Sequence, residues 1–244
     1  MRIRVINPNT TTRMTALIGD AARAVAAPGT EISAVNPSFG APSIECHHDD
    51  VWAAAGVAEQ VRLGEADGAD AYVIACFGDP GLHAARELAC GPVIGIAEAA
   101  FHAASLVATG FSVVTTLTRT CVIAEHLVLQ YGFERRCRGI YGTDIAVLEL
   151  DDPASDAYAR ILACARSALA HDRSGAIVLG CAGMAELCHR LQAELGVPVI
   201  DGVAVAVKFA EGLVGLGLGT SKQGDYALPP AKNYAGLAKS SSPR

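Results

Sequence analysis

Two apolar runs of strand length stand out in the hydrophobic pattern of the chain, AYVIACFG at residues 71–78 and AIVLGCAG at residues 176–183. Neither run alternates between apolar and polar positions, which is typical of a parallel strand that is buried on both faces. Each run carries a cysteine near its end, and a glycine follows two residues later. Because open α/β sheets bind ligands beyond the carboxyl ends of their strands, the pattern predicts that Cys76 and Cys181 lie at candidate ligand sites.

Further apolar runs alternate with helical stretches through the first half of the chain. The predicted elements are strands at residues 2–7, 31–35 and 92–96, beside the run at 71–78, and helices over 13–26 and 50–65. Asp79 and Pro80 predict one more helix, as its N-cap and its first residue. Strands that alternate with helices in this way are typical of βαβ units and parallel sheets.

The second half of the chain repeats the order of the first. Val5 and Val113 hold matching places 108 positions apart, Pro92 and Pro198 lie 106 apart, and the cysteines of the two runs lie 105 apart. A near-constant offset over three landmarks indicates an internal duplication. The sequence therefore predicts an α/β protein of two pseudo-symmetric lobes, each with a parallel sheet.

The duplication also predicts where the chain passes between the lobes. A helix follows each of the strands that begin at Pro92 and Pro198, so we expect crossovers near residues 98 and 208. The first lobe is then residues 1–98 plus 208–244, and the second is residues 99–207. The active site is expected in the cleft between the two lobes.

Composition excludes several classes of partner. With a formal net charge of −6 and no cluster of lysine or arginine before the tail, the chain lacks the basic surface that nucleic acids require. The longest weakly polar stretch, at 203–218, falls short of the ~20 residues that span a bilayer. The amino terminus lacks the apolar core of a signal peptide, so we expect a cytoplasmic protein without a membrane segment.

The eight cysteines predict neither disulfides nor a structural zinc. They are scattered, no pair has CxxC spacing, and a cytoplasmic chain is kept reduced. The four lysines all lie in the last 37 residues, away from any strand end, which argues against pyridoxal phosphate. The acidic and histidine run at 47–50 lacks a metal-binding spacing, so we expect no metal and no cofactor.

Two thiols that face one cleft from corresponding strand ends predict a specific chemistry. One can act as a base on one face of a carbon while the other acts as an acid on the opposite face. We expect the pKa of both thiols to be lowered by the helix N-termini that follow them. Gly78 and Gly183 would let backbone N–H groups approach a substrate oxygen.

At this point the motifs show a resemblance that covers nearly the whole chain. The sequence resembles the hydantoin and allantoin racemase branch of the aspartate/glutamate racemase superfamily in INPNT at 6–10, ACFGDPGL at 75–82, VIGIAEAA at 93–100, TTLTRT at 115–120 and GCAGM at 180–184. The resemblance implies two flavodoxin-like lobes and racemisation without a cofactor. It implies that Cys76 and Cys181 are the catalytic acid and base.

Departures from other branches of that superfamily bear on the small-molecule substrate. Glutamate racemases carry Asn-Thr after the first cysteine and Thr-His after the second, where this chain has Phe77-Gly78 and Ala182-Gly183. The loss of these polar groups favours a neutral ring over a free amino acid. Arylmalonate decarboxylases keep only the second cysteine. The resemblance therefore implies a racemase of allantoin or of 5-substituted hydantoins that exchanges the proton at C5.

Other pocket residues follow less directly from the sequence. Asn9 and Thr118 follow the first strand of each repeat and could donate hydrogen bonds to ring oxygens, although helix capping is an equal alternative for Thr118. Phe39 and Ile44 could wall the ring, or their loop could be a plain connection.

Two other functions stay open from the residues alone. One is a racemase of another small acid or amino acid, and the other is a two-lobed binding protein that leaves its ligand unchanged. Exposed apolar positions on alanine-rich helices also predict a homo-oligomer.

Overall fold

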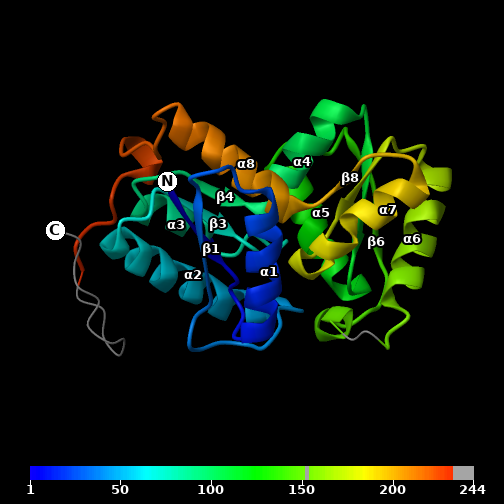
Figure 1. Cartoon of the computed structure of the whole chain (residues 1–244), viewed down its shortest axis with the longest axis horizontal. Helices are drawn as coiled ribbons and strands as arrows, with labels where there is room; N and C mark the ends of the chain where they lie inside the picture. The colour runs from blue at the N-terminus through cyan, green and yellow to red at the C-terminus, as the bar shows by residue number, and fades with distance from the viewer. Residues whose placement is uncertain (152–153, 233–244) are drawn as a thin grey trace.

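The computed structural model describes residues 1–151 and 154–232. The end of the predicted first lobe, residues 233–244, lies outside the described residues. The described chain forms two α/β lobes side by side (Figure 1).

The first lobe is a four-stranded parallel sheet in the order β2-β1-β3-β4. Its strands are β1 (Arg2–Ile6), β2 (Glu31–Val35), β3 (Ala71–Ile74) and β4 (Val93–Gly95), and the helices between them are α1 (Thr12–Val25), α2 (His47–Asp67) and α3 (Leu82–Leu88). The register pairs Val5 with both Ala34 and Val73. Every residue of β3 is buried, as the unbroken apolar run predicts.

The second lobe repeats this topology in the order β6-β5-β7-β8. Its strands are β5 (Phe111–Thr115), β6 (Cys137–Gly142), β7 (Ala176–Leu179) and β8 (Val199–Ile200), with helices α5 (Cys121–Gln130), α6 (Ala157–Asp172) and α7 (Cys188–Leu195). Short 3₁₀ turns complete it at η1 (Thr118–Thr120), η2 (Val147–Asp151) and η3 (Ala182–Leu187). The predicted class, two α/β lobes with corresponding parallel sheets, is confirmed.

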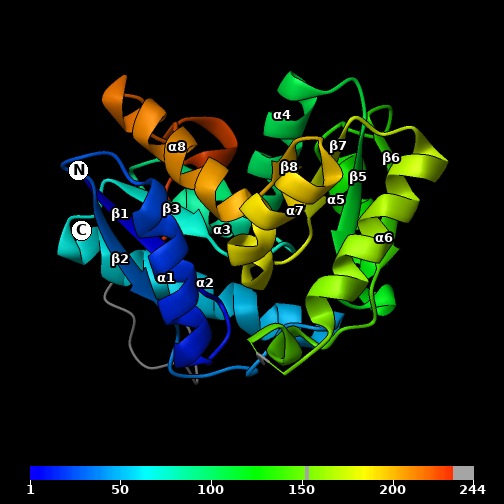
Figure 2. The ribbon, with the colours of Figure 1, turned by 45° about the vertical axis from the view of Figure 1, so that its right-hand side comes forward.

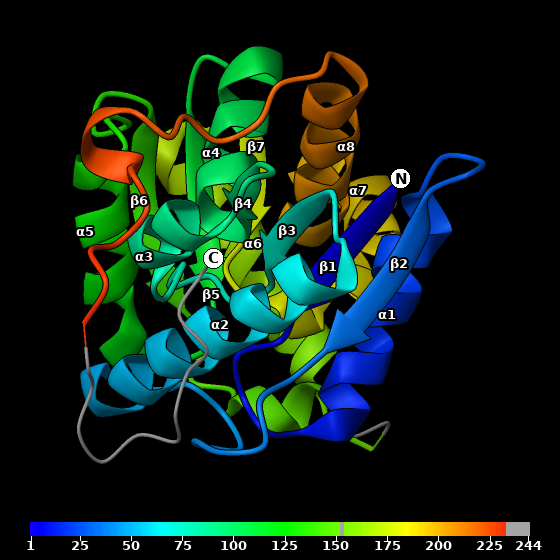
Figure 3. The same ribbon diagram turned by 90° about the vertical axis from the view of Figure 1, so that its left-hand side faces the viewer.

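The two lobes exchange one helix each. The helix α4 (Ile96–Val107) follows β4 but packs on β7 and β8, whereas α8 (Gly202–Gly215) follows β8 and packs on β3, β4 and α1. The two helices also pack against each other. Figure 3 shows both in the upper half of the molecule as it is viewed there. The predicted crossover positions, near residues 98 and 208, fall within these two helices, and the division of the chain there stays a prediction.

The start of α8 depends on a glycine. A Cβ atom at Gly202 would lie 2.4 Å from the carbonyl oxygen of Ile96, the first residue of α4. No side chain fits at that distance from a backbone atom, so Gly202 permits the close approach of the two exchanged helices.

The core at the lobe junction is aromatic. Phe101 of α4 is fully buried and stacks on Phe111 of β5 at 5.4 Å between ring centroids. Phe77, from the loop after β3, meets the edge of Phe101 at 5.6 Å. The loop that carries Cys76 is thereby packed against a helix of the opposite sheet.

The helix predicted to begin at Asp79 and Pro80 was placed wrongly. The helix α3 begins at Leu82 with Gly81 as its N-cap, and Asp79 has a φ of 44°. Its carboxylate instead accepts hydrogen bonds from the N–H groups of Ala97, at 3.1 Å, and Glu98, at 3.0 Å. Asp79 therefore caps α4, a helix that starts 17 residues later in the chain.

This capping explains why α4 has no N-cap side chain of its own. A Cβ atom at Gly95 would lie 2.3 Å from the Asp79 carboxyl carbon. The corresponding helix α8 is capped locally, since Asp201 accepts hydrogen bonds from the N–H groups of Val203 and Ala204. In both repeats an aspartate therefore caps the exchanged helix. Asp79 caps α4 from a distant loop, whereas Asp201 directly precedes α8.

None of the described helices combines the length and the apolar character that crossing a membrane would require.

Candidate active site

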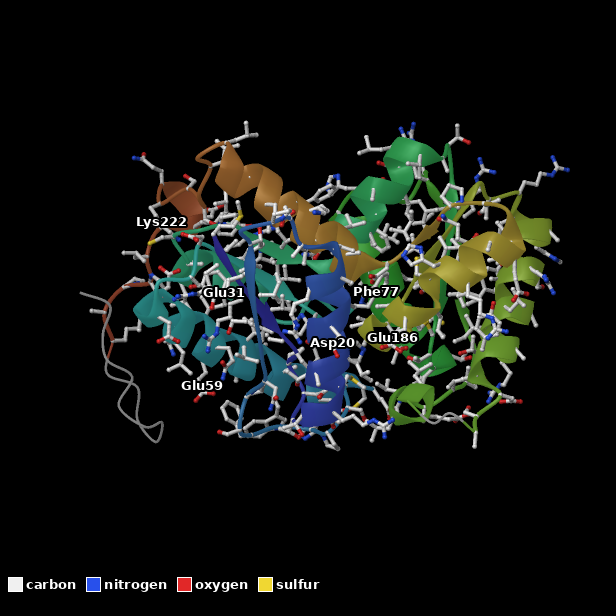
Figure 4. The ribbon with its side chains drawn as sticks, viewed as in Figure 1. Asp20, Glu31, Glu59, Phe77, Glu186 and Lys222 are labelled. Carbon is white, nitrogen blue, oxygen red and sulfur yellow. The ribbon has the colours of Figure 1, made fainter. Side chains whose placement is uncertain are left out.

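A cavity lies between the lobes, beyond the carboxyl ends of the central strands. It encloses about 660 Å³, part of it open to solvent. Phe77, which lines it, lies where the two lobes meet (Figure 4). The lining comes from both lobes and consists of Asn7, Asn9, Met14, Ile44, Asp50, Ala75, Cys76, Phe77, Gly78, Thr115, Thr116, Thr120, Ile123, Ala124, Val147, Gly180, Cys181 and Ala182.

The structure brings the two predicted cysteines into this one cavity. Cys76 follows β3 and Cys181 follows β7, and both are half-buried cysteines that form no disulfide among the described residues. The strands β3 and β7 hold the same place in their sheets, next to β1 and β5 respectively. The two thiols therefore enter the cavity from corresponding points of the two repeats.

The expected lowering of the pKa is wrong for Cys76. The pKa of its thiol is raised to about 12, mainly by burial and in part by the charges of Cys181, Asp50 and Asp79, against a hydrogen bond from the Gly78 N–H group that lowers it. The helix that was expected to lower this pKa begins only at Leu82. In the ligand-free protein Cys76 is therefore a neutral thiol at pH 7.

Asn9 presents a polar group to the cavity. Its side-chain oxygen accepts hydrogen bonds from Asn7 Nδ2, at 2.8 Å, and from the Thr11 N–H group, at 2.9 Å. These bonds fix the orientation of the amide, so that its Nδ2 atom meets, among the described residues, only the Met14 sulfur, at 3.2 Å. A sulfur atom is a weak acceptor, which leaves this N–H group available to a ligand oxygen.

The predicted partner of Asn9 in the second repeat lies elsewhere. Thr118 is exposed on η1 and does not line the cavity, and its N–H group donates to the carboxylate of Asp144 at 2.9 Å. Thr115 and Thr116 line the cavity in its place. The offset of 108 that matches Val5 with Val113 also matches Asn7 with Thr115. This offset could have identified Asn7 and Thr115 as cavity residues from the sequence.

Of the two residues predicted to wall the ring from the loop after β2, one lines the cavity and the other does not. Ile44 lines the cavity, whereas Phe39 is an exposed side chain outside the lining. Next to Ile44, Glu45 accepts a hydrogen bond of 3.1 Å from the N–H group of Val147, a cavity residue on the second lobe. The loop therefore contacts the second lobe, and Figure 2 shows the start of α2 reaching toward that lobe.

The residues that follow each cysteine lie at or beside the cavity. Phe77, Gly78 and Ala182 line it, while Gly183 is set back, with the position of a Cβ atom 3.7 Å from Cys181 Sγ. Among the described residues, none accepts a hydrogen bond from the Phe77 N–H group. This N–H group is free to meet a ligand oxygen.

The electrostatics of the cavity are simple. Among the described residues that line it, none carries a positive charge, and Asp50 carries the only negative one. Asp50 escaped the sequence analysis because it belongs to the run at 47–50, which resembles a solvated helix start. In the described part of the chain no three His, Cys, Asp or Glu side chains are grouped to hold a metal ion.

Comparison with known proteins identifies the family. A family model described as Asp/Glu/Hydantoin racemase matches residues 3–210. The chain belongs to the Asp/Glu/hydantoin racemase family. Hydantoin racemase of Rhizobium meliloti is 50% identical over 236 residues, 97% of this chain and 98% of that protein. The resemblance seen in the motifs is therefore confirmed.

Solved structures of this racemase family share the whole fold. Allantoin racemase from Klebsiella pneumoniae matches with a TM-score of 0.95 at 60% identity and covers 97% of this chain and 96% of that chain. Allantoin racemase from Pseudomonas fluorescens matches with a TM-score of 0.93 at 42% identity, over 97% and 100% of the two chains. These names are those of isomerases, the class of enzyme that the sequence predicts.

Proposed function

We propose that this protein is a cofactor-independent racemase of a cyclic ureide, which interconverts the enantiomers of allantoin or of 5-substituted hydantoins. The observation that carries the proposal is the pair of thiols, Cys76 and Cys181, in one cavity between the repeats. The relatives named hydantoin racemase and allantoin racemase support the same class of substrate.

In the proposed reaction one cysteine, as the thiolate, takes the proton from C5 of the ring. The electron pair of the C–H bond moves into the adjacent carbonyl group and forms an enolate. The opposite thiol then gives its proton to the other face of C5 and becomes the thiolate. Charge and protons balance, and the enzyme is left ready for the reverse direction.

The protonation state of Cys76 suggests how the roles divide. Burial keeps this thiol protonated at neutral pH. We assign Cys76 as the acid, and Cys181 as the base, for the direction of turnover that begins from this state. The Asn9 amide and the Phe77 N–H group are the donors that we assign to the ring oxygens, where the enolate charge develops.

The charge of the cavity supports a neutral substrate. The carboxylate of an amino acid needs a cation or several donors, and the described lining residues supply no cation. The one charged group, Asp50, would repel such a carboxylate. These facts favour a cyclic ureide over the free amino acids on which other branches of the superfamily act.

Racemisation of a single enantiomer tests the proposal. The wild type should remove the optical rotation of (S)-allantoin or of an L-5-substituted hydantoin without an added cofactor. Cys76→Ser and Cys181→Ser should each lower the rate by at least about 10³-fold, because a serine hydroxyl does not ionise in this pH range. Cys90→Ser, which removes an exposed cysteine outside the cavity, is the matched control and should retain the rate.

Two outcomes would contradict the proposal. Near-normal racemisation by both cysteine variants would exclude the two-base mechanism. No racemisation of any hydantoin by the wild type, with ligand binding retained, would favour the two-lobed binding protein instead.

A further inference from the structure

The carboxylate of Asp50 occupies a distinctive place in the cavity. Asp50 lies in the first turn of α2, and its Oδ1 atom is 3.4 Å from the position that a Cβ atom would take at Gly78. Its charge acts on the Cys76 thiol. The carboxylate therefore lies beside the reacting groups, and the missing side chain at Gly78 leaves the space in front of it open.

No described residue donates a hydrogen bond to the Asp50 side chain. Its neighbour Asp49 accepts a bond of 3.0 Å from the Glu45 N–H group, and the buried Asp79 accepts from three donors. Burial raises the pKa of Asp50, and only the charge of His47 acts in the opposite direction. A partly buried carboxylate without donors is costly, so a ligand that supplies N–H groups there gains free energy.

A second cavity adjoins the first at this point. Its empty volume is about 460 Å³, part of which is open solvent, and Asp50 and Gly78 line both cavities. Its lining is more polar than that of the first and includes Asp79, His83, Gln130 and Tyr131. A group attached to the reacting carbon beside Cys76 therefore lies next to Asp50 and close to a polar space.

We infer that Asp50 determines substrate specificity by accepting hydrogen bonds from N–H groups of a ureido substituent on the reacting carbon. The inference rests on the proposed racemase function and names its substrate class, the ureido-substituted hydantoins of which allantoin is the simplest. A ureido group carries N–H donors and suits the polar second cavity. An alkyl or aryl group at the same carbon would cover the carboxylate without giving it a donor.

The ring of a hydantoin also carries N–H groups. These could donate hydrogen bonds to the Asp50 carboxylate in place of the ureido group. Substrates that share the ring but differ in the substituent separate the two sources. Allantoin has both ring and ureido donors, whereas 5-isopropylhydantoin has only the ring donors. If Asp50 contacts the substituent, its replacement affects the first substrate more than the second.

The experiment measures kcat/KM for allantoin and 5-isopropylhydantoin in the wild type and in Asp50→Asn. The variant keeps the shape of the side chain and removes its charge. The ratio of kcat/KM for allantoin to that for 5-isopropylhydantoin should fall by roughly 10- to 100-fold, the worth of a hydrogen bond to a charged group. Asp50→Ser, which removes the group from the cavity, should lower the ratio at least as much and serves if Asp50→Asn does not fold.

Asp49→Asn is the matched control. It removes the same charge from the same helical turn, but Asp49 does not line either cavity. Its ratio should stay within about twofold of the wild type.

The outcomes separate this inference from the proposed function. Equal losses of kcat/KM on both substrates would assign the contact to the ring and overturn the inference. Unchanged kcat/KM on both substrates would overturn it as well. In both cases racemisation by the wild type would leave the proposed function standing. A wild type that racemises neither these two substrates nor any other 5-substituted hydantoin would overturn both.

Discussion

The carboxylate of Asp79 accepts a hydrogen bond of 2.9 Å from the hydroxyl of Tyr131, the residue that ends α5 on the opposite lobe. The same carboxylate caps α4 through the N–H groups of Ala97 and Glu98. Asp79 lies three residues after Cys76, so one side chain ties the cysteine loop to the exchanged helix and to the second lobe. The position of the Cys76 thiol therefore depends on a residue that does not line its cavity.

Asp79 gives the stability of the protein a specific pH dependence. Burial raises its pKa to about 7 from an ordinary value of 3.8. Between these values the folded state holds a proton that the unfolded state has released. The contribution is therefore present below about pH 4 and is lost as the pH rises to about 7, by up to about 4 kcal/mol. In Asp79→Asn the free energy of unfolding, measured with urea from pH 4 to 8, should lose this slope.

Asp49→Asn is the control for that profile. A hydrogen bond from the Glu45 N–H group lowers the pKa of Asp49, so its contribution is present above its ordinary pKa and is lost as the pH falls below that value. Asp49→Asn should therefore leave the slope between pH 5 and 7 unchanged. A wild-type slope that persists in Asp79→Asn would show that another group carries it.

The contact between the exchanged helices makes a second prediction. In Gly202→Ala the new methyl group would lie 2.4 Å from the Ile96 carbonyl oxygen, and α4 and α8 would have to move apart. The free energy of unfolding should fall by about 1–3 kcal/mol, as in other overpacked cores. Urea unfolding at constant pH measures the change.

Gly212→Ala in the same helix is the matched control. A Cβ atom at Gly212 meets nothing within 4 Å. Alanine is the better helix former, so this variant should gain about 0.5–1 kcal/mol. Equal effects of the two substitutions would show that helix propensity, and not the approach to Ile96, decides the result.

Much of the fold could be predicted because it follows from the local pattern of apolar residues and from the repeated order of the elements. The runs that became β3 and β7 are apolar throughout, since both faces of these central strands are covered. The offsets between the repeats then gave the two sheets and placed Cys76 and Cys181 at corresponding strand ends. These features depend on residues close together in sequence or on a repeated order, and both are visible without coordinates.

The features that were missed depend on contacts between distant segments. Asp79 next to Pro80 has the local pattern of a helix start, but its carboxylate caps α4 because Gly95 leaves room for it. Asp50 belongs to a polar run, and only the fold shows that it turns toward Cys76. Thr118 follows its strand much as Asn9 does, but η1 directs it to solvent.

A third prediction compares Asn9, which lines the cavity, with Thr118, which is exposed outside it. Asn9→Ala removes the amide donor that faces the cavity, and kcat/KM for a ureide racemised by the wild type should fall about 10-fold or more. Thr118→Ala changes an exposed side chain outside the lining and should stay within about twofold of the wild type. Initial rates measured by polarimetry compare the two, and a larger effect at Thr118 would show that η1 closes onto the substrate.

The raised pKa of the Cys76 thiol makes the last prediction. Iodoacetamide reacts with the thiolate, so alkylation of Cys76 in the ligand-free protein should rise about 10-fold for each pH unit between pH 7 and 10, without a plateau. The charges of Asp50 and Asp79 raise this pKa, so Asp50→Asn or Asp79→Asn should lower it and speed the alkylation at a given pH. Peptide mass spectrometry separates Cys76 from the exposed Cys90, and the slope with pH, unlike the absolute rate, does not depend on how easily the reagent enters the cavity. A rate at Cys76 that is already independent of pH at 7 would show that this residue is the thiolate of the free enzyme, and the acid and base roles assigned to Cys76 and Cys181 would then be exchanged.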